Sequence, residues 1–208
     1  SNVRVTISGR DGSEKTLTLT RGGGGSLSRV NNIKDLDDGY MYIKVSSFDN
    51  SSPAAELKQN IDRLMASRGL IIDLRDNGGG SSTIGYDLLA CLTNRPIPLN
   101  RSTERREGGT VRLKQNAYAW QPLEGNIKSV YEKPCSRIID KPVVLLIGPR
   151  TISAAEDFVS SFRALKRGLL IGMPTAGSTG QPYTFRLPGG GTARITVKHD
   201  VGADGVDF

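Results

Sequence analysis

The chain has 208 residues, enough for one sizeable hydrophobic core with an appendage. Its hydrophobic fraction of 37% and charged fraction of 24% are typical of a soluble globular protein, and no apolar run approaches the roughly 20 residues of a transmembrane helix. The formal charge is +7, but the basic residues are scattered and lack interleaved aromatic side chains, so we expect no nucleic-acid partner.

An alternating pattern at the N-terminus predicts a β-hairpin over residues 2–21. Asp11-Gly12 supplies the turn, and apolar side chains alternate along both strands (Val3, Val5 and Ile7, then Leu17 and Leu19). A lone hairpin is marginal in water, so it belongs either to another domain or to the N-terminal edge of the core. The glycines at 22–25 and the polar residues up to Asp38 predict a linker.

The first predicted core element is a strand within residues 39–48, where apolar and polar side chains alternate. Ser52-Pro53 then gives a cap and a first helical position, and apolar residues recur at helical spacing (Leu57, Ile61, Leu64 and Met65). This helix leads into an apolar strand that begins at Gly69. The resulting β-α-β unit predicts a fold of the α/β class.

The strand that begins at Gly69 ends in a turn with three consecutive glycines, Gly78, Gly79 and Gly80. Glycines let the backbone expose its amides to a ligand at close range, so this turn can hold an oxyanion. A tight turn without a ligand is the alternative for an isolated glycine triplet.

The two cysteines, Cys91 and Cys135, lie at the ends of the least periodic part of the chain. Cys91 falls on the predicted buried face of a helix at residues 86–92. The spacing of the two residues is unlike a metal site, and two cysteines do not decide the redox compartment. Between them, Tyr118 and Trp120 are candidates for contacting an apolar substrate side chain, with an ordered surface excursion as the alternative.

Residues 143–147 form an unbroken apolar run between Pro142 and Gly148, which predicts a strand buried on both faces and followed by a helix. Ser153 stands in the turn between them, and Glu156 follows three residues later, so the pair matches a capping box. A serine at such a turn also has its hydroxyl beside free backbone amides, as serine nucleophiles do on several α/β folds. A plain helix cap is the alternative.

The C-terminal part begins with an apolar strand at residues 169–171, which repeats the β-α-β unit. Residues 175–181 are rich in glycine and small hydroxyl side chains, and we predict that they border the same cleft as Ser153. Strands at 183–187 and 193–197 pair as a hairpin. His199 follows; it is a candidate general base for Ser153, but we favour a surface residue at a strand end.

Three segments resemble, in order, the signature segments of the C-terminal processing (tail-specific) serine peptidases. They are LIIDLRDNGGG at residues 70–80, GPRTISAAEDF at 148–158 and GMPTAGSTGQP at 172–182. Three ordered motifs are far more specific than any single one, and the resemblance spans residues 39–208. The superfamily also contains the tricorn core protease and the interphotoreceptor retinoid-binding proteins, and the third segment looks more like that branch.

The resemblance implies catalytic roles. Ser153 would be the nucleophile, and its own amide or that of Ala154 would form an oxyanion hole with an amide of Gly79 or Gly80. Three further residues would line the site (Ser178, Thr179 and Gln181).

The sequence departs from the family pattern at the residues that would supply and support the general base. Processing peptidases with a Ser-Lys dyad carry a lysine at the position that Ser178 matches, and a supporting aspartate where Ala164 stands, so that dyad is missing. In the tricorn and retinoid-binding branch a histidine from a helical domain ahead of the PDZ module is the base. We therefore expect the base to come from outside this chain.

The implied fold is a ClpP/crotonase-like core of repeated β-β-α units over residues 39–208, which stops before the segment where the family finishes its core. Residues 1–21 would be the last strands of a PDZ domain, and 22–38 a linker. The expected function is hydrolysis of peptide or protein substrates by acyl-enzyme chemistry, without metal or cofactor. The parent protein would be periplasmic or exported, although these residues contain no signal peptide. The alternative is a non-catalytic relative that binds an apolar ligand or a peptide C-terminus in the same cleft.

Overall fold

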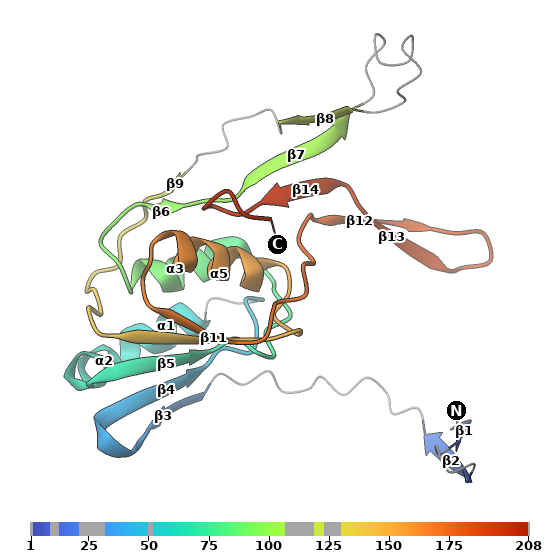
Figure 1. The fold of residues 1–208 in the computed structure, drawn as a ribbon, viewed down its shortest axis with the longest axis horizontal. Coiled ribbons are helices and arrows are strands. Elements are labelled where there is room, and N and C mark those ends of the chain that lie inside the picture. The colour runs from blue at the N-terminus through green and yellow to red at the C-terminus, as the bar shows by residue number, and fades with distance from the viewer. Residues whose placement is uncertain are drawn as a thin grey trace.

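The computed structural model describes residues 2–8, 13–20, 32–49, 52–106, 119–122 and 130–207. A five-stranded sheet lies at its centre, in the order β11-β10-β5-β4-β3 (Figure 1). Its parallel strands are β4 (Tyr40–Lys44), β5 (Gly69–Asp73), β10 (Val143–Ile147) and β11 (Leu169–Gly172). The predicted α/β class is therefore confirmed.

Helices connect the parallel strands, as the β-α-β pattern predicts. They are α1 (Ser52–Gln59) and α2 (Ile61–Ala66) after β4, α3 (Ser82–Ala90) after β5, and α5 (Ala154–Ala164) after β10. Helix α3 contacts both α1 and α5, and α3 and α5 lie over one face of the sheet (Figure 1). The side chains beneath them form the hydrophobic core (among them Met41, Ile43, Leu70, Ile72 and Leu145).

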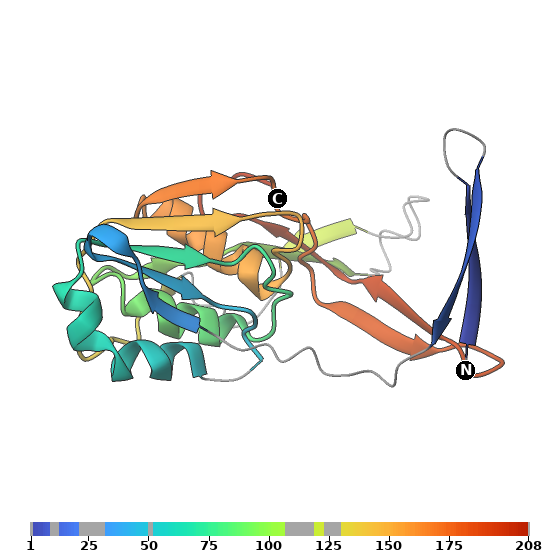
Figure 2. The ribbon, with the colours of Figure 1, turned by 90° about the horizontal axis from the view of Figure 1, so that it is seen from below.

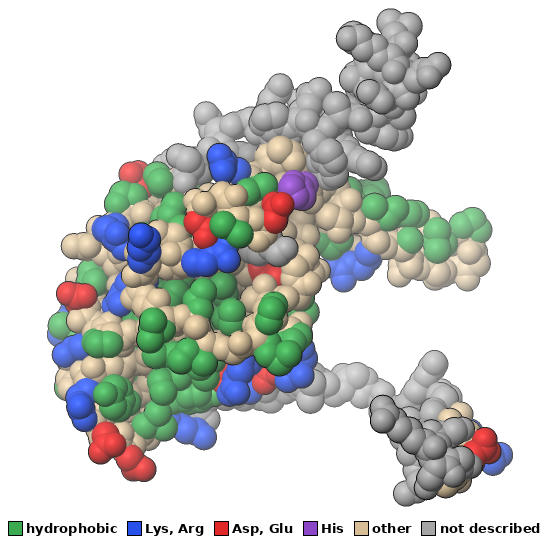
Figure 3. Space-filling model, in the orientation of Figure 1, with side chains coloured by type: hydrophobic (Ala, Val, Ile, Leu, Met, Phe, Trp, Pro, Cys, Tyr) green, Lys and Arg blue, Asp and Glu red, His purple; other side chains and the backbone are tan. Residues whose placement is uncertain are grey.

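The opposite face of the sheet is only partly covered by described residues. Strand register places Tyr42, Ile71, Val144 and Leu169 on this face, and their side chains are half-buried or exposed. Hydrophobic side chains reach the surface over β5 and β11 (Figure 3). The prediction that residues 143–147 are buried on both faces is therefore wrong, because the helices cover one face alone.

The N-terminal hairpin forms as predicted. Strands β1 (Asn2–Ser8) and β2 (Glu14–Thr20) pair antiparallel, with Val3 opposite Leu19, whereas the expected turn at Asp11-Gly12 lies outside the described residues. In Figure 2 the hairpin lies apart from the five-stranded sheet.

The expected linker over residues 22–38 is too long at its C-terminal end. Strand β3 (Asn32–Asp35) pairs antiparallel with β4 at the edge of the central sheet, and a 3₁₀ turn, η1 (Asp37–Gly39), joins the two. A short and mostly polar edge strand owes its order to pairing with its neighbour, so the local sequence did not signal it.

Further strands extend the core toward the candidate site. Strand β6 (Ile97–Pro98) pairs with β9 (Val130–Tyr131), and β14 (Lys198–Val201), β7 (Arg101–Arg106) and β8 (Ala119–Pro122) form a three-stranded sheet. Strands β12 (Pro182–Arg186) and β13 (Thr192–Thr196) form the predicted second hairpin.

The proposed substrate contacts of the aromatic pair stay a prediction. Tyr118 lies outside the described residues, and only the backbone of Trp120 is described, in β8. Among the described helices, none has the length and apolar character that crossing a membrane requires.

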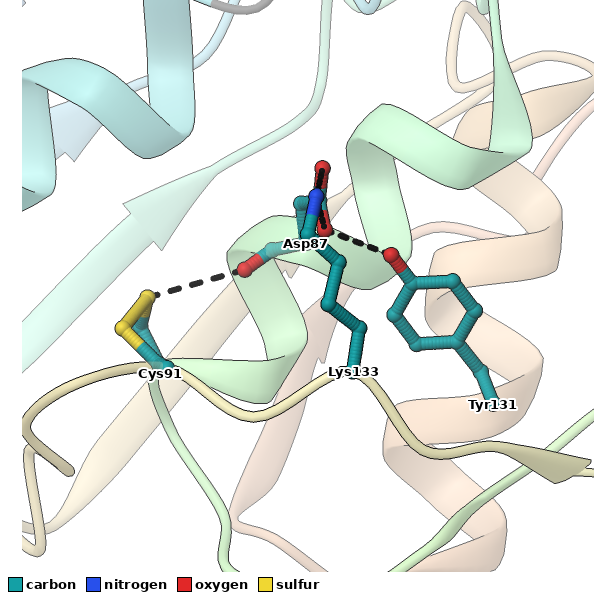
Figure 4. The surroundings of a disulfide bond; sticks show 5 residues. Asp87, Cys91, Tyr131 and Lys133 are labelled. Atoms are coloured by element: carbon teal, nitrogen blue, oxygen red, sulfur yellow. Dashed lines mark hydrogen bonds and ion pairs between the residues drawn. A yellow bond between two sulfur atoms is a disulfide. The ribbon is translucent and has the colours of Figure 1, made fainter.

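Cys91 and Cys135 form a disulfide that joins the end of α3 to the segment after β9 (Figure 4). Cys91 is fully buried, which confirms the predicted buried helix face. Two side chains from β9 and the residues that follow it reach Asp87 of α3: the Tyr131 hydroxyl donates to its carboxylate at 2.5 Å, and the Lys133 ammonium lies 3.0 Å from it (Figure 4). The C-terminal end of α3 is thus fixed by one covalent and two polar links.

Candidate active site

Ser153 lies in the turn between β10 and α5 with an unusual backbone conformation. Its φ is 58° and its ψ is −124°, whereas an N-cap residue normally has extended φ and ψ. A positive φ outside glycine typically costs about 1–3 kcal/mol and persists only where the surroundings enforce it. Ser153 therefore differs from a plain helix cap.

Hydrogen bonds around the Ser153 amide enforce this conformation. The amide lies 3.1 Å from the Ser178 carbonyl oxygen and 3.0 Å from Glu156 Oε2, and both oxygens accept from it. The fully buried Glu156 carboxylate also accepts from the amides of Gly177 at 2.6 Å and Ser178 at 2.9 Å. The predicted capping box between Ser153 and Glu156 is therefore present, and its Glu156 carboxylate also ties the Ser153 turn to residues 177–178.

The glycine turn after β5 packs directly against the Ser153 turn. The Ile152 amide donates to the Asn77 carbonyl oxygen at 3.0 Å. A Cβ atom added to Gly79 would lie 2.8 Å from Ser153 Cβ and 2.8 Å from the Ile152 carbonyl oxygen. Gly79 also has a φ of 97°, so both its conformation and this close approach require glycine. The two turns are therefore in direct contact.

The four amides expected to form an oxyanion hole are not equally available. The Gly79 amide donates to Asn77 Oδ1 at 2.9 Å, and the Ser153 amide is already bonded as described. Within the described residues, the amides of Gly80 and Ala154 have no hydrogen-bond acceptor. Gly80 and Ala154 are thus the better donors for an oxyanion, and Gly79 instead allows the two turns to approach.

A cavity of about 360 Å³ opens beside Ser153. It is lined by Ser153 and Gly80 from the two turns and by Thr179 and Gln181, two of the predicted site residues. The remaining lining consists of four polar or charged residues together with a glycine and a proline (Ser82, Asp157, Lys198, Asp200, Gly180 and Pro182). The Ser178 carbonyl oxygen accepts from the Ser153 amide, and Ser178 lines an adjacent cavity.

His199 lies in that adjacent cavity and does not line the one beside Ser153. Its side chain is 53% exposed, and Nε2 is 3.8 Å from Asp207 Oδ1. This position supports the interpretation of His199 as a surface residue.

Sequence reasoning missed three charged residues of the cavity. Asp157 lies one helical turn after Ser153 on α5, and its carboxylate accepts from the Ser82 hydroxyl at 2.5 Å and the Asn100 amide at 2.7 Å. Lys198 and Asp200 come from β14 and form an ion pair at 3.1 Å. The i, i+4 spacing from Ser153 was a usable signal for Asp157. Only the pairing of β14 with β7 places the other two.

The environment of the cavity shifts the pKa of Asp157. Burial raises the pKa of its carboxyl, and the negative charge of Asp200 raises it further. The Ser82 hydroxyl, the Lys198 charge and the Asn100 amide oppose this rise without reversing it. Keeping the Asp157 carboxylate in its charged form therefore lowers the free energy of unfolding.

A strained serine at the start of a helix, beside the unpaired backbone amides of Gly80 and Ala154, is an arrangement that α/β serine hydrolases share. The family model of Peptidase family S41 matches residues 39–208. The chain therefore belongs to peptidase family S41.

Sequence relatives are C-terminal processing peptidases. Carboxyl-terminal-processing peptidase 2, chloroplastic, of Arabidopsis thaliana is 24% identical over 160 residues, which cover 75% of this chain and 27% of that protein. Carboxy-terminal processing protease CtpA of Bacillus subtilis (strain 168) is 26% identical over 213 residues, covering 96% of this chain and 41% of that protein. The chain spans less than half the length of these relatives.

Solved structures share the fold. A putative peptidase from Parabacteroides merdae superposes with a TM-score of 0.68 at 25% identity, over 85% of this chain and 53% of that one. The photosystem II D1 C-terminal processing protease gives a TM-score of 0.64 at 23% identity, over 100% of this chain and 52% of that one. The closer placement with the tricorn and retinoid-binding branch stays a prediction.

Proposed function

We propose that this chain is the catalytic core of a serine endopeptidase of the C-terminal processing type. The observation that carries the proposal is the conformation of Ser153, whose strained backbone is enforced beside a cavity that Gly80 also lines. A helix cap does not need that conformation, whereas a nucleophile gains from a hydroxyl held rigidly beside oxyanion donors.

The proposed reaction is acyl transfer. Ser153 Oγ attacks the scissile carbonyl carbon, and the amides of Gly80 and Ala154 donate to the oxygen that becomes negatively charged. A general base accepts the hydroxyl proton and returns it to the leaving amine, and water then hydrolyses the acyl-enzyme. Thr179 and Gln181 line the path of the substrate.

The proposed base lies outside residues 1–208. Ser178 occupies the position of the family's lysine, and His199 lies in a different cavity. Lys198 lines the Ser153 cavity, but its ammonium is paired with Asp200 at 3.1 Å. Positioned oxyanion donors alone can retain on the order of 10³-fold rate over water, so the isolated chain should cleave slowly.

The composition of the cavity favours the peptidase over a carrier of apolar ligands. Its lining residues are mostly hydroxyl, amide, carboxylate and ammonium groups, whereas sites for apolar ligands are lined mainly by hydrophobic side chains.

We further propose that the parent protein carries a PDZ domain that ends with the β1–β2 hairpin, ahead of a ClpP/crotonase-like core. The expected exported or periplasmic location gains support from the disulfide between Cys91 and Cys135, because disulfides persist in oxidising compartments. Relatives named as chloroplastic are consistent with a lumenal or exported setting.

The test is proteolysis of an unstructured protein substrate by the full-length protein, followed by mass spectrometry. Ser153→Ala should lower the cleavage rate at least about 10³-fold and leave peptide binding within about twofold, because it removes the nucleophile without opening a cavity. Ser161→Ala is the matched control, since Ser161 lies on the same helix and bonds the Pro98 carbonyl away from the cavity. Cleavage by Ser153→Ala at the parent rate would show that Ser153 is only a helix cap.

A further inference from the structure

The charges beside Ser153 do not balance. The cavity lining contains two carboxylates, Asp157 and Asp200, and one ammonium, Lys198, which leaves one negative charge. Asp200 is satisfied: its side chain is 3% exposed, pairs with Lys198 at 3.1 Å and accepts from the Ser102 hydroxyl at 2.6 Å. The unbalanced charge therefore belongs to Asp157.

Asp157 has only neutral hydrogen-bond partners, the Ser82 hydroxyl and the Asn100 amide. Among the residues that the structure describes, none forms an ion pair with Asp157; the charge of Lys198 acts on it and lowers its pKa in part, but that ammonium is paired with Asp200 at 3.1 Å. Asp157 is half-buried, and a carboxylate that is removed from water is normally paired with a cation, because desolvation otherwise disfavours the charged form. The raised pKa of Asp157, caused first by burial and then by Asp200, is the expected consequence.

We infer that the cavity beside Ser153 receives a cationic side chain, lysine or arginine, of the residue that supplies the scissile carbonyl, and that Asp157 is its counter-ion. This inference rests on the proposed function and names the substrate class of the same site. The residue that supplies the carbonyl is the relevant one, because Ser153 and Asp157 line one cavity. A side chain whose backbone carbonyl touches Ser153 Oγ can therefore enter it.

The size and lining of the cavity agree with this occupant. About 360 Å³ lies at the lower end of the range for small-molecule sites, which suits one extended side chain better than a larger group. Hydroxyl and amide groups of Thr179 and Gln181 give the stem a polar wall. A neutral apolar side chain would leave Asp157 unpaired, whereas an acidic one would place a second uncompensated negative charge beside it.

The test measures binding, so that it does not depend on turnover. The full-length protein carrying Ser153→Ala is titrated, by fluorescence anisotropy, with N-acetylated peptides that differ at one residue: lysine, norleucine or glutamate. Acetylation removes the charge of the peptide N-terminus, so the lysine side chain is the one cation by which the peptides differ. Norleucine has the same aliphatic stem as lysine without the charge. We expect lysine to bind about tenfold more tightly than norleucine, and glutamate more weakly than both.

Asp157→Asn in the same background should reduce the lysine-to-norleucine ratio to about one. Asparagine fits the site, because its oxygen can accept from Asn100 and its amide can donate to the Ser82 hydroxyl. Asp62→Asn is the matched control: it changes the net charge equally at a side chain that is 85% exposed and pairs with Arg137 on the surface. Asp157→Glu keeps the charge and should keep the preference, which provides a second variant if Asp157→Asn folds poorly.

The outcomes separate this inference from the proposed function. Equal binding of the lysine and norleucine peptides, or a preference that survives Asp157→Asn, overturns the inference even if the parent cleaves peptides. A lysine preference that Asp157→Asn abolishes supports it even if the parent hydrolyses nothing, in which case the proposed function alone fails.

Discussion

The molecule contains two strand-turn-helix units side by side, and they contribute different chemical groups to one cavity. The unit β10-turn-α5 presents a side chain, Ser153, whose own amide is held by Ser178 and Glu156. The unit β5-turn-α3 presents backbone, with Gly79 in contact with Ser153 and Gly80 lining the cavity. The same topology thus contributes the proposed nucleophile in one unit and a proposed oxyanion donor in the other.

The two units differ in how a residue with positive φ is accommodated. At Gly79, with a φ of 97°, glycine adopts the conformation without a steric penalty and lets two turns touch. At Ser153, with a φ of 58°, the proposed nucleophilic side chain rules out glycine. Hydrogen bonds to the buried Glu156 carboxylate offset the strain of this conformation. Each unit can be perturbed separately, which makes the comparison testable.

Among substitutions that keep Ser153 itself, the largest effect is expected from Gly79→Ala. The new Cβ would lie 2.8 Å from Ser153 Cβ and from the Ile152 carbonyl oxygen, so the nucleophile must move. Displacement by about 1 Å can lower the rate roughly 100-fold, and we expect at least that loss in a peptide cleavage assay.

Gly148→Ala is the control for this prediction. It adds a methyl group with its nearest neighbour at 3.8 Å and with no positive φ, so its activity should remain near that of the parent. Full activity in Gly79→Ala would mean that the two turns are not in contact during catalysis.

Glu156→Gln should have the next largest effect, and it acts on the other unit. The carboxylate accepts from the amides of Ser153, Gly177 and Ser178, whereas a glutamine offers one oxygen and turns two donors toward these amides. Hydrogen bonds to a charged group contribute about 1.5–3 kcal/mol each, so we expect destabilisation of roughly 2 kcal/mol or more together with reduced activity. Urea unfolding measures the first, and an unchanged midpoint would contradict the role of Glu156.

Removal of the disulfide should destabilise the unit β5-turn-α3 and leave the stability of the unit β10-turn-α5 nearly unchanged. Cys91 and Cys135 are 44 residues apart, for which the chain-entropy relation gives about 4 kcal/mol of stabilisation. A variant with both cysteines changed to alanine should melt at a lower temperature, and the amides of α3 should exchange faster than those of α5. Equal acceleration in both helices would show that the disulfide does not distinguish the two units.

The smallest expected effect is that of Asp157 on the pH dependence of protein stability. A carboxyl with a raised pKa binds its proton more tightly in the folded state, so stability falls as pH rises from the unfolded value of 3.8 through the raised folded value. Asp157→Asn should remove this fall and raise the melting temperature at neutral pH by a few degrees, since about 1 kcal/mol corresponds to roughly 2–4 °C at this size. Parallel melting curves for parent and variant at all pH values would contradict the raised pKa.

Sequence patterns predicted those parts of the structure that local chemistry determines. The parallel strands, the two hairpins and the strand-to-helix turn at Ser153 follow from apolar periodicity and turn residues. Motif order placed Thr179 and Gln181 beside the cavity. Each of these features is encoded within a short stretch of chain.

The features that were missed depend on contacts between distant segments. Strand β3 gains order from the edge of β4, and the half-exposed face of β10 reflects where the helices pack. Lys198 and Asp200 reach the cavity because β14 pairs with β7, far earlier in the chain: the Ser102 hydroxyl bonds Asp200 across a separation of 98 residues. No local pattern records such a pairing.

Covalent labelling tests the central claim most directly, that the fold activates Ser153 as a nucleophile. The full-length protein is treated with a fluorophosphonate probe, and the modified residue is located by peptide mapping. We expect a single phosphonylated serine in the peptide that contains Ser153, lost in Ser153→Ala and kept in Ser161→Ala. Labelling of another serine, or none in a folded full-length protein, would contradict the assignment of Ser153 as the nucleophile.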